Sequence, residues 1–331
     1  MRCNMKIGKI PESVLKRSVF KQIHHRRSEV LIRPNVGEDC SYVDTSQSEV
    51  MVLSSDPITG TVQDVGRLAA YITANDIASS GAEMIGIMVT LLLPEETTEQ
   101  TLKEIMAELE ASCKELNIEI MGGHTEVTAA VNQPIASITG VGKLTKEDMV
   151  TTSGLKPGQD IVMTKWAGLE GTAIIAKAKE EELLSRYTRD FIGGAKKFIN
   201  HISVVEEARI AKQYEVTSMH DVTEGGIYGA LWEIAAASGV GVEIQLKSIP
   251  LRQETVEICE FYDLNPYLLI SSGSLLMGTF KGRELVDALE EVGIPAAIIG
   301  KVTSGNERIV INEEERRYLE PPKCDELYKV K

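Results

Sequence analysis

The sequence has 331 residues, of which 43% are hydrophobic and 25% are charged, and these proportions are typical of a globular protein. Its formal net charge of −14 disfavours a nucleic acid or an anionic membrane as a partner, because a phosphate surface attracts a basic face. A chain of this length predicts two domains, and we expect them to span residues 1–150 and 151–331.

The composition also predicts a cytoplasmic protein that does not contact a membrane. No apolar run approaches the roughly 20 residues that cross a bilayer, and the first residues, MRCN, lack the apolar core of a secretion signal. The five cysteines are scattered and form no CxxC pair, which fits a reducing compartment and excludes the usual thiolate zinc site. Most of them are expected to fill the core.

The chain opens with a predicted helix over residues 11–23, because a proline stands at its start and apolar residues follow at helical spacing. The basic run His24–Arg27 comes next, and its simplest interpretation is a solvated helix end, where cations suit the helix dipole. A short strand over residues 29–32 then leads to a turn-rich loop that contains Gly37 and Asp39.

The segment from Val50 to Pro94 carries the strongest signals. A strand-like apolar run ends at Asp56, and apolar residues then recur every three or four positions from Val65 onward, as on one face of a helix. Asp76 falls on this apolar stripe. A carboxylate that faces a core costs about 2–7 kcal/mol unless something pairs with it. Asp76 therefore requires a cation, a metal or a hydrogen-bond donor, and Ser79–Gly81 or an arginine could supply donors in a purely structural role.

Three aspartates in the first half of the chain are candidates for a metal site. Asp39 lies in a loop, Asp56 follows an apolar strand, and Asp76 lies on the helix stripe. Mg²⁺ takes few carboxylates in proteins and usually joins them to phosphate oxygens, so this set predicts a site for a hard cation. The residues alone leave a second interpretation open, in which the glycines and aspartates serve only as caps and turns.

The rest of the first half predicts an α+β domain with helices on one side of a sheet. The run Ile85–Leu93 is the most hydrophobic of the chain, and residues 97–117 form the clearest amphipathic helix. A strand over residues 118–121 is expected to run into the segment Gly122–Thr125, and another strand follows over residues 135–142. The amphipathic helix is expected to be scaffold.

The second half begins after a polar, turn-rich boundary over residues 144–157. A strand over residues 160–164 precedes Gly168-Leu-Glu-Gly171, which opens a helix over residues 173–182. Small residues at a helix start let an anion approach free N–H groups, so this turn could bind a phosphate. Tight packing explains the same glycines equally well.

Residues 220–226, HDVTEGG, form a predicted turn between a strand over residues 216–219 and a helix over residues 227–238. Asp221 and Thr223 are good N-capping types, and capping alone would account for both. The charged residues 320–331 are expected to lie loosely on the surface. The other predicted elements of this half are helices over 203–214, 254–262 and 283–292 and strands over 242–246, 268–270, 275–280 and near 298 and 309.

A series of short motifs occurs in order along the chain: Gly37-Glu-Asp39, Ser55-Asp56, Asn75-Asp76, Gly122-Gly123-His124-Thr125, Pro157-Gly-Gln-Asp160 and His220-Asp221-Val-Thr-Glu-Gly225-Gly226. These motifs resemble the GDDAA, TTD, ND(I/L)AxxGA, GGDT or GGHT, PGDxI and D(P/V)(T/S)xGG segments of the aminoimidazole ribonucleotide (AIR) synthase superfamily. Within it, the hydrogenase expression/formation proteins (HypE) are the most similar, because Cys259–Pro266 resembles their CExLGLDP segment. The resemblance covers nearly the whole chain.

The resemblance implies an α+β fold of two α/β-type domains, in which strands of the N-terminal domain pair into a β-barrel across a homodimer. It implies ATP and Mg²⁺ as cofactors and an enzyme that phosphorylates a carbonyl or amide oxygen, so that this oxygen becomes a leaving group. The HypE-like motifs add hydrogenase maturation with a partner protein. The implied metal ligands are Asp39, Asp56 and Asp76, the nucleotide contacts also include Gly37, Asn75, Gly122, Gly123, His124 and Thr125, and the catalytic residues are His220 and Asp221.

The sequence departs from HypE at positions that bear on the chemistry. HypE ends in a cysteine that is the substrate thiol, whereas Cys324 is followed by seven residues here, so a separate substrate is expected. His124 stands where HypE has aspartate, which removes one metal carboxylate. His220 replaces an arginine, and it either polarises a substrate oxygen or makes a structural hydrogen bond. The alternative function is a homodimeric maturation scaffold that binds a partner protein with little or no catalysis.

Overall fold

The computed structural model describes residues 12–14, 16, 28–32, 35–46, 48–59, 64–321 and 324–330. The chain divides into two compact units: the first comprises Asp39–Met149 with residues 28–32, and the second comprises Val150–Lys331 with residues 35–38 and the described N-terminal residues. Of the predicted first helix, the structure describes α1 (Glu12–Val14), and the basic run His24–Arg27 lies outside the described residues.

A six-stranded sheet forms the centre of the first unit, in the order β1-β2-β3-β6-β4-β5. Neighbouring strands are antiparallel except β4 and β5, which are parallel because a helix crosses over between them. The strands are β1 (Val30–Ile32), β2 (Ser41–Asp44), β3 (Glu49–Ile58), β4 (Glu83–Leu93), β5 (Glu119–Val127) and β6 (Ile135–Thr145).

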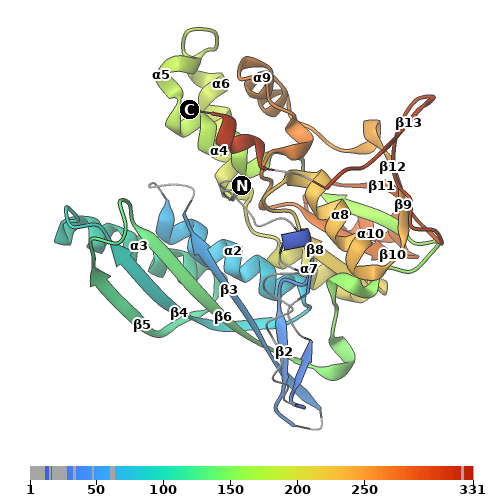
Figure 1. The fold of residues 1–331 in the computed structure, drawn as a ribbon, viewed down its shortest axis with the longest axis horizontal. Helices are drawn as coiled ribbons and strands as arrows, with labels where there is room; N and C mark the ends of the chain where they lie inside the picture. Colours follow the sequence, from blue (N-terminus) through green and yellow to red (C-terminus); the bar gives the residue numbers. More distant parts are fainter. Residues whose placement is uncertain are drawn as a thin grey trace, which may run out of the picture. The chain divides into compact units, whose positions relative to one another are not determined.

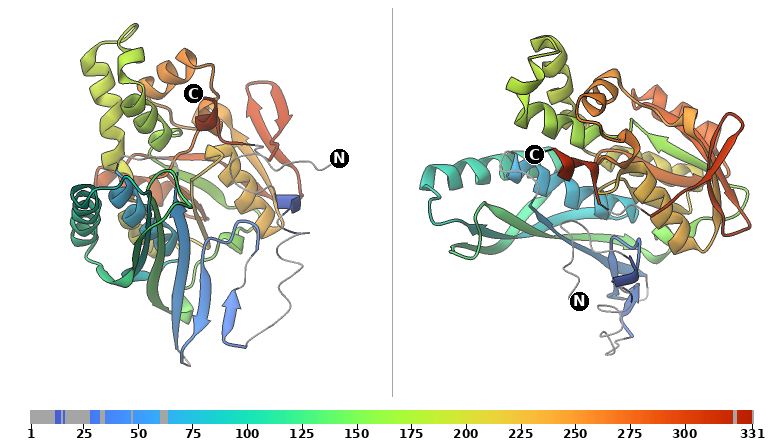
Figure 2. Two further views of the ribbon diagram at one scale, coloured as in Figure 1. Left: turned by 60° about the vertical axis from the view of Figure 1, so that its left-hand side comes forward. Right: turned by 45° about the horizontal axis from the view of Figure 1, so that its top comes forward.

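Helices α2 (Val65–Ser79) and α3 (Glu99–Leu116) lie on one side of this sheet, as Figures 1 and 2 show. The residues of the apolar stripe predicted for α2 are buried, but so is almost every other residue of this helix, so burial is not confined to one face. Gly66 lets the two helices approach closely, because a Cβ there would overlap the carbonyl oxygen of Ile105 on α3. Helix α3 begins after Thr98, whose side chain accepts the N–H of Thr101 at 3.1 Å.

No described helix of the first unit covers the opposite face of this sheet. Side chains alternate between the two faces along each strand, so every second residue points away from α2 and α3. Large apolar side chains on this side of β3, β4 and β5 remain exposed, and Ile85 and Met88 are 42% and 43% exposed. The exposed apolar residues on this side of these strands are Met51, Ile85, Met88 and Met121. A patch of this kind is typical of an interaction surface.

The second unit contains a seven-stranded sheet in the order β13-β12-β9-β11-β7-β10-β8. Strands β12 and β9 are parallel, and the other neighbours are antiparallel. The strands are β7 (Asp160–Thr164), β8 (Ser218–Asp221), β9 (Gly241–Gln245), β10 (Leu275–Thr279), β11 (Ala296–Thr303), β12 (Arg308–Asn312) and β13 (Glu315–Tyr318).

Two groups of apolar residues hold the helices of the second unit. One core lies between α8 and the sheet and includes Leu231, Ile234 and Met163. A second core joins α4, α6 and α9, which Figure 1 shows grouped together beside the sheet. The helices are α4 (Leu169–Ala178), α5 (Glu180–Leu183), α6 (Arg189–Lys196), α7 (Val205–Ala211), α8 (Gly226–Ser238), α9 (Gln253–Phe261) and α10 (Gly282–Glu291).

The architecture confirms the predicted α+β class in both units. Neither sheet closes into a barrel within the part of the chain that the structure describes. Cys40, Cys113 and Cys259 are buried, as predicted for core fillers, and Cys324 is exposed. Among the described residues, no helix has both the length and the apolar character required to cross a bilayer.

Several predicted boundaries were wrong. Strand β3 does not end at Asp56 but continues to Ile58, and β5 continues through Gly122 and Gly123 to Val127 at positive φ angles that glycine adopts readily. The strand predicted over residues 268–270 is absent, and a 3₁₀ turn, η8 (Pro266–Leu268), lies there instead. The last residues were predicted to lie loosely, but residues 324–330 pack against the second unit through a 3₁₀ turn, η9 (Glu326–Lys329).

Gly123 is expected to be irreplaceable in β5. A Cβ at this position would overlap the carbonyl oxygen of Val89 on β4, and its φ of 149° also favours glycine. Gly123→Ala should therefore lower the free energy of unfolding by about 3 kcal/mol, measured by urea denaturation. Gly122→Ala is the matched control, because its φ of 156° is similar but its Cβ would lie 3.4 Å from the flexible side chain of Met88. If both variants lose the same free energy of unfolding, the steric clash expected at Gly123 is contradicted.

Candidate functional site

The structure brings Asp56 and Asp76 together on the helix side of the first sheet. Ser54 and Asp56 are two residues apart on β3 and therefore share the face that α2 covers. The hydroxyl of Ser54 donates to Oδ2 of Asp76 at 2.5 Å and lies 3.4 Å from Oδ2 of Asp56. Asp76 is 4% exposed, as expected for a residue on the apolar stripe of α2.

The chemistry of this group fits a hard cation. The hydroxyl of Ser54 has one proton, so it donates to one carboxylate at a time and cancels neither charge. Two carboxylates and a hydroxyl are oxygen donors, the ligand type that Mg²⁺ prefers. Of the donors considered for a structural role of Asp76, Ser79 does not donate to the carboxylate, because its Oγ donates to the backbone oxygen of Asp76 at 2.7 Å.

The neighbours of this pair are held by α2 and by the start of β2. Asn75 is fully buried on α2. The thiol of Cys40 donates to the backbone oxygen of Asp76 at 3.1 Å. Asp39 directly precedes Cys40 and is half-buried. The structure therefore places Cys40, the neighbour of Asp39, against α2, the helix that carries Asp76. All three residues belong to the first unit.

The glycine-histidine segment lies on the edge strand β5, not in a loop. The strand register connects His124, through one residue each of β4 and β6, with Pro57 of β3. His124 is thus three strands away from β3, about 14 Å at roughly 4.8 Å per strand. Its Nε2 lies 3.0 Å from Oε2 of Glu126, and both side chains are exposed. The structure places Gly122–Thr125 on the sheet that holds Asp56 but not beside this aspartate.

The predicted catalytic residues His220 and Asp221 belong to the second unit, where both are buried on β8. Nε2 of His220 lies 3.1 Å from Oε2 of Glu233 on α8. Gly37 lies against the same helix at a φ of 78°, where a Cβ would be 3.0 Å from the carbonyl oxygen of Glu233. The contact with Glu233 fixes the ring of His220 in either of its two predicted roles.

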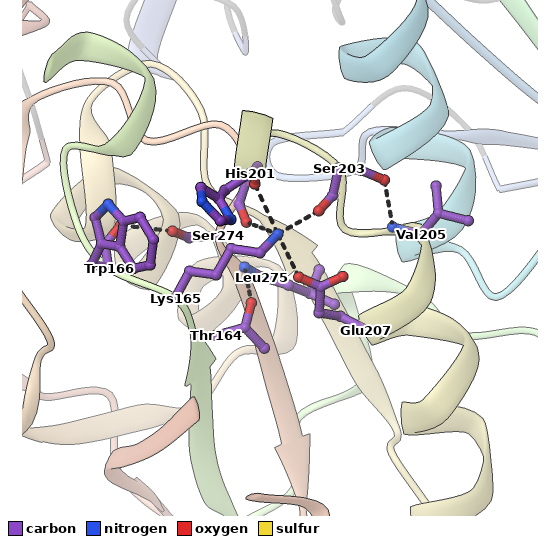
Figure 3. A network of polar contacts seen from close by, with 10 residues as sticks. Thr164, Lys165, Trp166, His201, Ser203, Val205, Glu207, Ser274 and Leu275 are labelled. Atoms are coloured by element: carbon purple, nitrogen blue, oxygen red, sulfur yellow. Dashed lines mark hydrogen bonds and ion pairs between the residues drawn. The ribbon is translucent and has the colours of Figure 1, made fainter. Parts of the chain in front are cut away.

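A buried lysine forms a network of polar contacts that the sequence did not predict (Figure 3). Lys165 follows β7 with a φ of 55°, and its Nζ donates to the carbonyl oxygens of His201 and Gly273, each at 2.9 Å, and to that of Ser203. It also pairs with Glu207 on α7 at 2.5 Å. The side chains of Lys165 and Glu207 are 8% and 2% exposed.

Burial shifts both members of this ion pair toward their neutral forms. It lowers the pKa of Lys165 and raises the pKa of Glu207, and the charge of each partner partly offsets the shift of the other. Three carbonyl oxygens take up the three N–H donors of the ammonium group, and the carboxylate of Glu207 lies beside it as the partner of opposite charge. We conclude that the pair is ionised and ties the β7–α4 loop to two other segments.

The N-terminus of α4 is closed by packing, which was one of the two interpretations of its glycines. The N–H of Gly168 donates to Oγ of Ser271 at 2.6 Å, and the N–H of Gly171 donates to the carbonyl oxygen of Ile270 at 3.0 Å. A Cβ at Gly171 would overlap the side chain of Leu269. These two N–H groups are already used within the protein, which favours tight packing as the role of the glycines.

Two family models match the chain. The model of the AIR synthase related protein N-terminal domain matches residues 37–144, and that of the C-terminal domain matches residues 156–312. A protein of Methanocaldococcus jannaschii, provisionally named a hydrogenase expression/formation protein, is 29% identical over 272 residues, which are 81% of this chain and 79% of that protein. Carbamoyl dehydratase HypE of Rhodobacter capsulatus is 27% identical over 216 residues, 65% of this chain and 61% of the relative.

Solved structures share the fold at lower identity. HypE in the crystal structure of a HypE-HypF complex has a TM-score of 0.73 at 21% identity, covering 85% of this chain and 93% of that chain. A hydrogenase maturation protein HypE in complex with ATP has a TM-score of 0.66 at 19% identity, covering 97% of this chain and 98% of that chain. The likeness at these identities shows the fold alone, a two-domain α+β architecture.

Proposed function

The chain belongs to the AIR synthase related protein family, and from this premise we propose that it is an ATP- and Mg²⁺-dependent enzyme. It phosphorylates a carbonyl or amide oxygen in a step of hydrogenase maturation, as the names of its HypE-like relatives suggest for them. The observation that carries the proposal is the group of Asp56, Ser54 and Asp76. Two carboxylates at one place, in a motif order typical of this family, are suited to a metal that binds a triphosphate.

Residues 1–150 are proposed to be the domain that binds ATP and Mg²⁺. Asp56 and Asp76 hold the divalent ion, with Asp39 as a further ligand. When bound, Mg²⁺ supplies the positive charge that neutralises a triphosphate. The aspartates would hold the ion at a fixed position. The phosphate groups that it neutralises would then need little rearrangement before the reaction. Gly122–Thr125 contact the nucleotide further along the sheet.

Residues 151–331 are proposed to act on the substrate. His220, oriented by Glu233, polarises the oxygen that is phosphorylated, and Asp221 lies next to it on β8. We place the oxygen on a separate molecule, because the residues that follow Cys324 pack into the second unit. One solved HypE is in complex with HypF, and we propose that a maturation partner also presents the substrate to this chain.

Phosphate release tests the proposed activity. The purified protein is incubated with Mg²⁺ and ATP, alone and with small amides or carbamoyl compounds, and inorganic phosphate is measured. We expect release that requires both Mg²⁺ and an amide or carbamoyl compound. Tight binding of ATP without release under every substrate would instead favour the maturation scaffold, which would need no phosphorylation step.

We further propose that the uncovered face of the first sheet is the interface of a homodimer. In a two-fold symmetric interface every residue contributes twice, so one charged substitution places two charges in the contact. Ile85→Glu should weaken dimerisation at least 100-fold, and we expect light scattering to show a monomer at micromolar concentration.

Val256→Glu is the matched control for this interface. Val256 is 38% exposed on α9 of the second unit, close to the 42% of Ile85, so the same change of charge is made away from the first sheet. This variant should keep the mass of the wild type. If both variants, or neither, become monomers, the first sheet is not the interface.

A further inference from the structure

Residues 324–330 form a C-terminal segment, called the strap below, that is anchored in the second unit through Asp325. Oδ2 of Asp325 accepts the N–H of Gly225 at 2.7 Å, and Oδ1 accepts the N–H groups of Leu327 and Ile270 at 2.8 Å and 3.3 Å. Asp325 is 4% exposed. Figure 1 shows the end of the chain beside α4 and α6. The strap thus buries a carboxylate among backbone donors.

The donor at 2.7 Å lies at the N-terminus of α8. Gly225 is the N-cap of this 13-residue helix and provides no side-chain cap of its own. A helix N-terminus carries partial positive charge and free N–H groups, and proteins use both to bind phosphate and carboxylate groups. Asp325 therefore occupies a position that suits an external anion.

A second carboxyl group borders the same place. Glu170 of α4 is 3% exposed, and its Oε2 accepts no hydrogen bond from any described residue. Its pKa is raised to about 7: burial raises it most, Ser272 lowers it, and the charges of Asp325 and Glu224 raise it further. Near neutral pH this carboxyl group is often protonated, and a protonated carboxyl group can donate a hydrogen bond to an anion.

The strap is held less strongly when Asp325 is charged than when it is protonated. Burial raises the pKa of Asp325 to about 6, although the N–H groups of Leu327, Gly225 and Ile270 lower it. A carboxylate that backbone donors stabilise well has a lowered pKa instead. Docking of the strap therefore becomes less favourable as the pH rises through about 6, where Asp325 loses its proton.

We propose that the N-terminus of α8 is an anion-binding site, which the chain fills with Asp325, and that release of the strap opens this site to the phosphate or carboxylate group of a ligand. The N–H groups of Gly225 and Ile270 hold the anion, and the carboxyl group of Glu170 borders it. Because Asp325 is tethered, its effective concentration is high and it competes with free anions. The site does not depend on the proposed activity, since it shares no residue with the aspartate group.

Sulfate is the probe, because it stays a dianion across the pH range in which the carboxyl groups titrate. Asp325→Ala should bind sulfate at least 10-fold more tightly than the wild type by calorimetry. Without sulfate, the amides of Gly225 and Ile270 should exchange at least 10-fold faster in this variant, and sulfate should restore their protection. Asp287→Ala on α10 is the matched control, because it removes an exposed carboxylate paired with Arg283 and should change neither property.

A second variant decides the question if Asp325→Ala fails to fold. Tyr328 of the strap donates to Oε1 of Glu224 at 2.6 Å, so Tyr328→Phe loosens the strap without changing the site. It should give a smaller gain in sulfate affinity. If the folded variants bind sulfate no better than the wild type, the site is overturned and Asp325 is only a cap of α8.

The pH dependence of sulfate binding distinguishes the effect of Glu170 from the effects of the other charged groups. The groups that face Glu170 are Asp325, Glu224 and Ser272, and Glu224 also faces Asp325. Bound sulfate should raise the pKa of Glu170 as the charge of Asp325 does, so protonation of Glu170 accompanies binding and Asp325→Ala should bind sulfate more tightly at pH 6 than at pH 8. Glu170→Gln in the same background should remove this dependence and keep the binding. An unchanged dependence would show that Glu170 does not border the anion.

Discussion

Asp76→Asn and Asp56→Asn are each expected to weaken binding of Mg·ATP at least 100-fold, about 2.7 kcal/mol, while the protein stays folded. The amide has nearly the shape of the carboxylate, so the amide oxygen introduced by Asp76→Asn could still accept the proton of Ser54, but a neutral amide is a much poorer ligand for Mg²⁺. Calorimetric titration with Mg·ATP measures the affinity, and thermal denaturation measures the fold.

Asp44→Asn is the control for these two variants. Asp44 lies on β2 of the same sheet and forms an ion pair with Lys146 at 2.7 Å, and both side chains are about one-third exposed. Its substitution should leave the affinity for Mg·ATP within about 2-fold of the wild type, since exposed ion pairs contribute little. Unchanged affinity in both site variants would remove the metal site from this protein.

The group of Asp56, Ser54 and Asp76 could be predicted in part from the sequence, because a carboxylate on an apolar helix stripe, such as Asp76, needs a partner. The apolar stripe of α2 places this residue in the core, and the alternation along β3 places Asp56 on the side that α2 covers. The donor that joins them, Ser54, could not be predicted, because the contact depends on how the strand packs against the helix. Roles for His220 and Asp221 rest on the family resemblance and stay predictions.

Long elements with clear periodicity were confirmed, whereas two short strands and the long-range contacts were missed. Strands β2 and β13 have four residues each and many polar side chains, so no alternation marks them. The packing of the strap depends on contacts between Asp325 and residues about 55 and 100 positions earlier. Lys165 and Glu207 are likewise far apart in sequence, and an isolated lysine after an apolar strand gives no sign of a buried partner.

Lys165→Met is expected to lower the free energy of unfolding by about 3–5 kcal/mol, as is usual when one member of a buried ion pair is removed. The substitution leaves the carboxylate of Glu207 buried without its cation, and the carbonyl oxygens of His201 and Gly273 lose a donor. Urea denaturation of the purified variant measures the loss.

A double-mutant cycle shows how much of this loss belongs to the ion pair. Lys165→Met combined with Glu207→Leu removes both charges, so it should recover part of the stability, but the three carbonyl oxygens that accept from Nζ stay without this donor. Lys301→Met is the control, because Lys301 pairs with Asp160 at 2.8 Å and is 67% exposed, and its loss should cost less than about 1 kcal/mol. Strictly additive losses in the cycle would mean that Lys165 and Glu207 do not stabilise each other, and that the carbonyl contacts alone hold the β7–α4 loop.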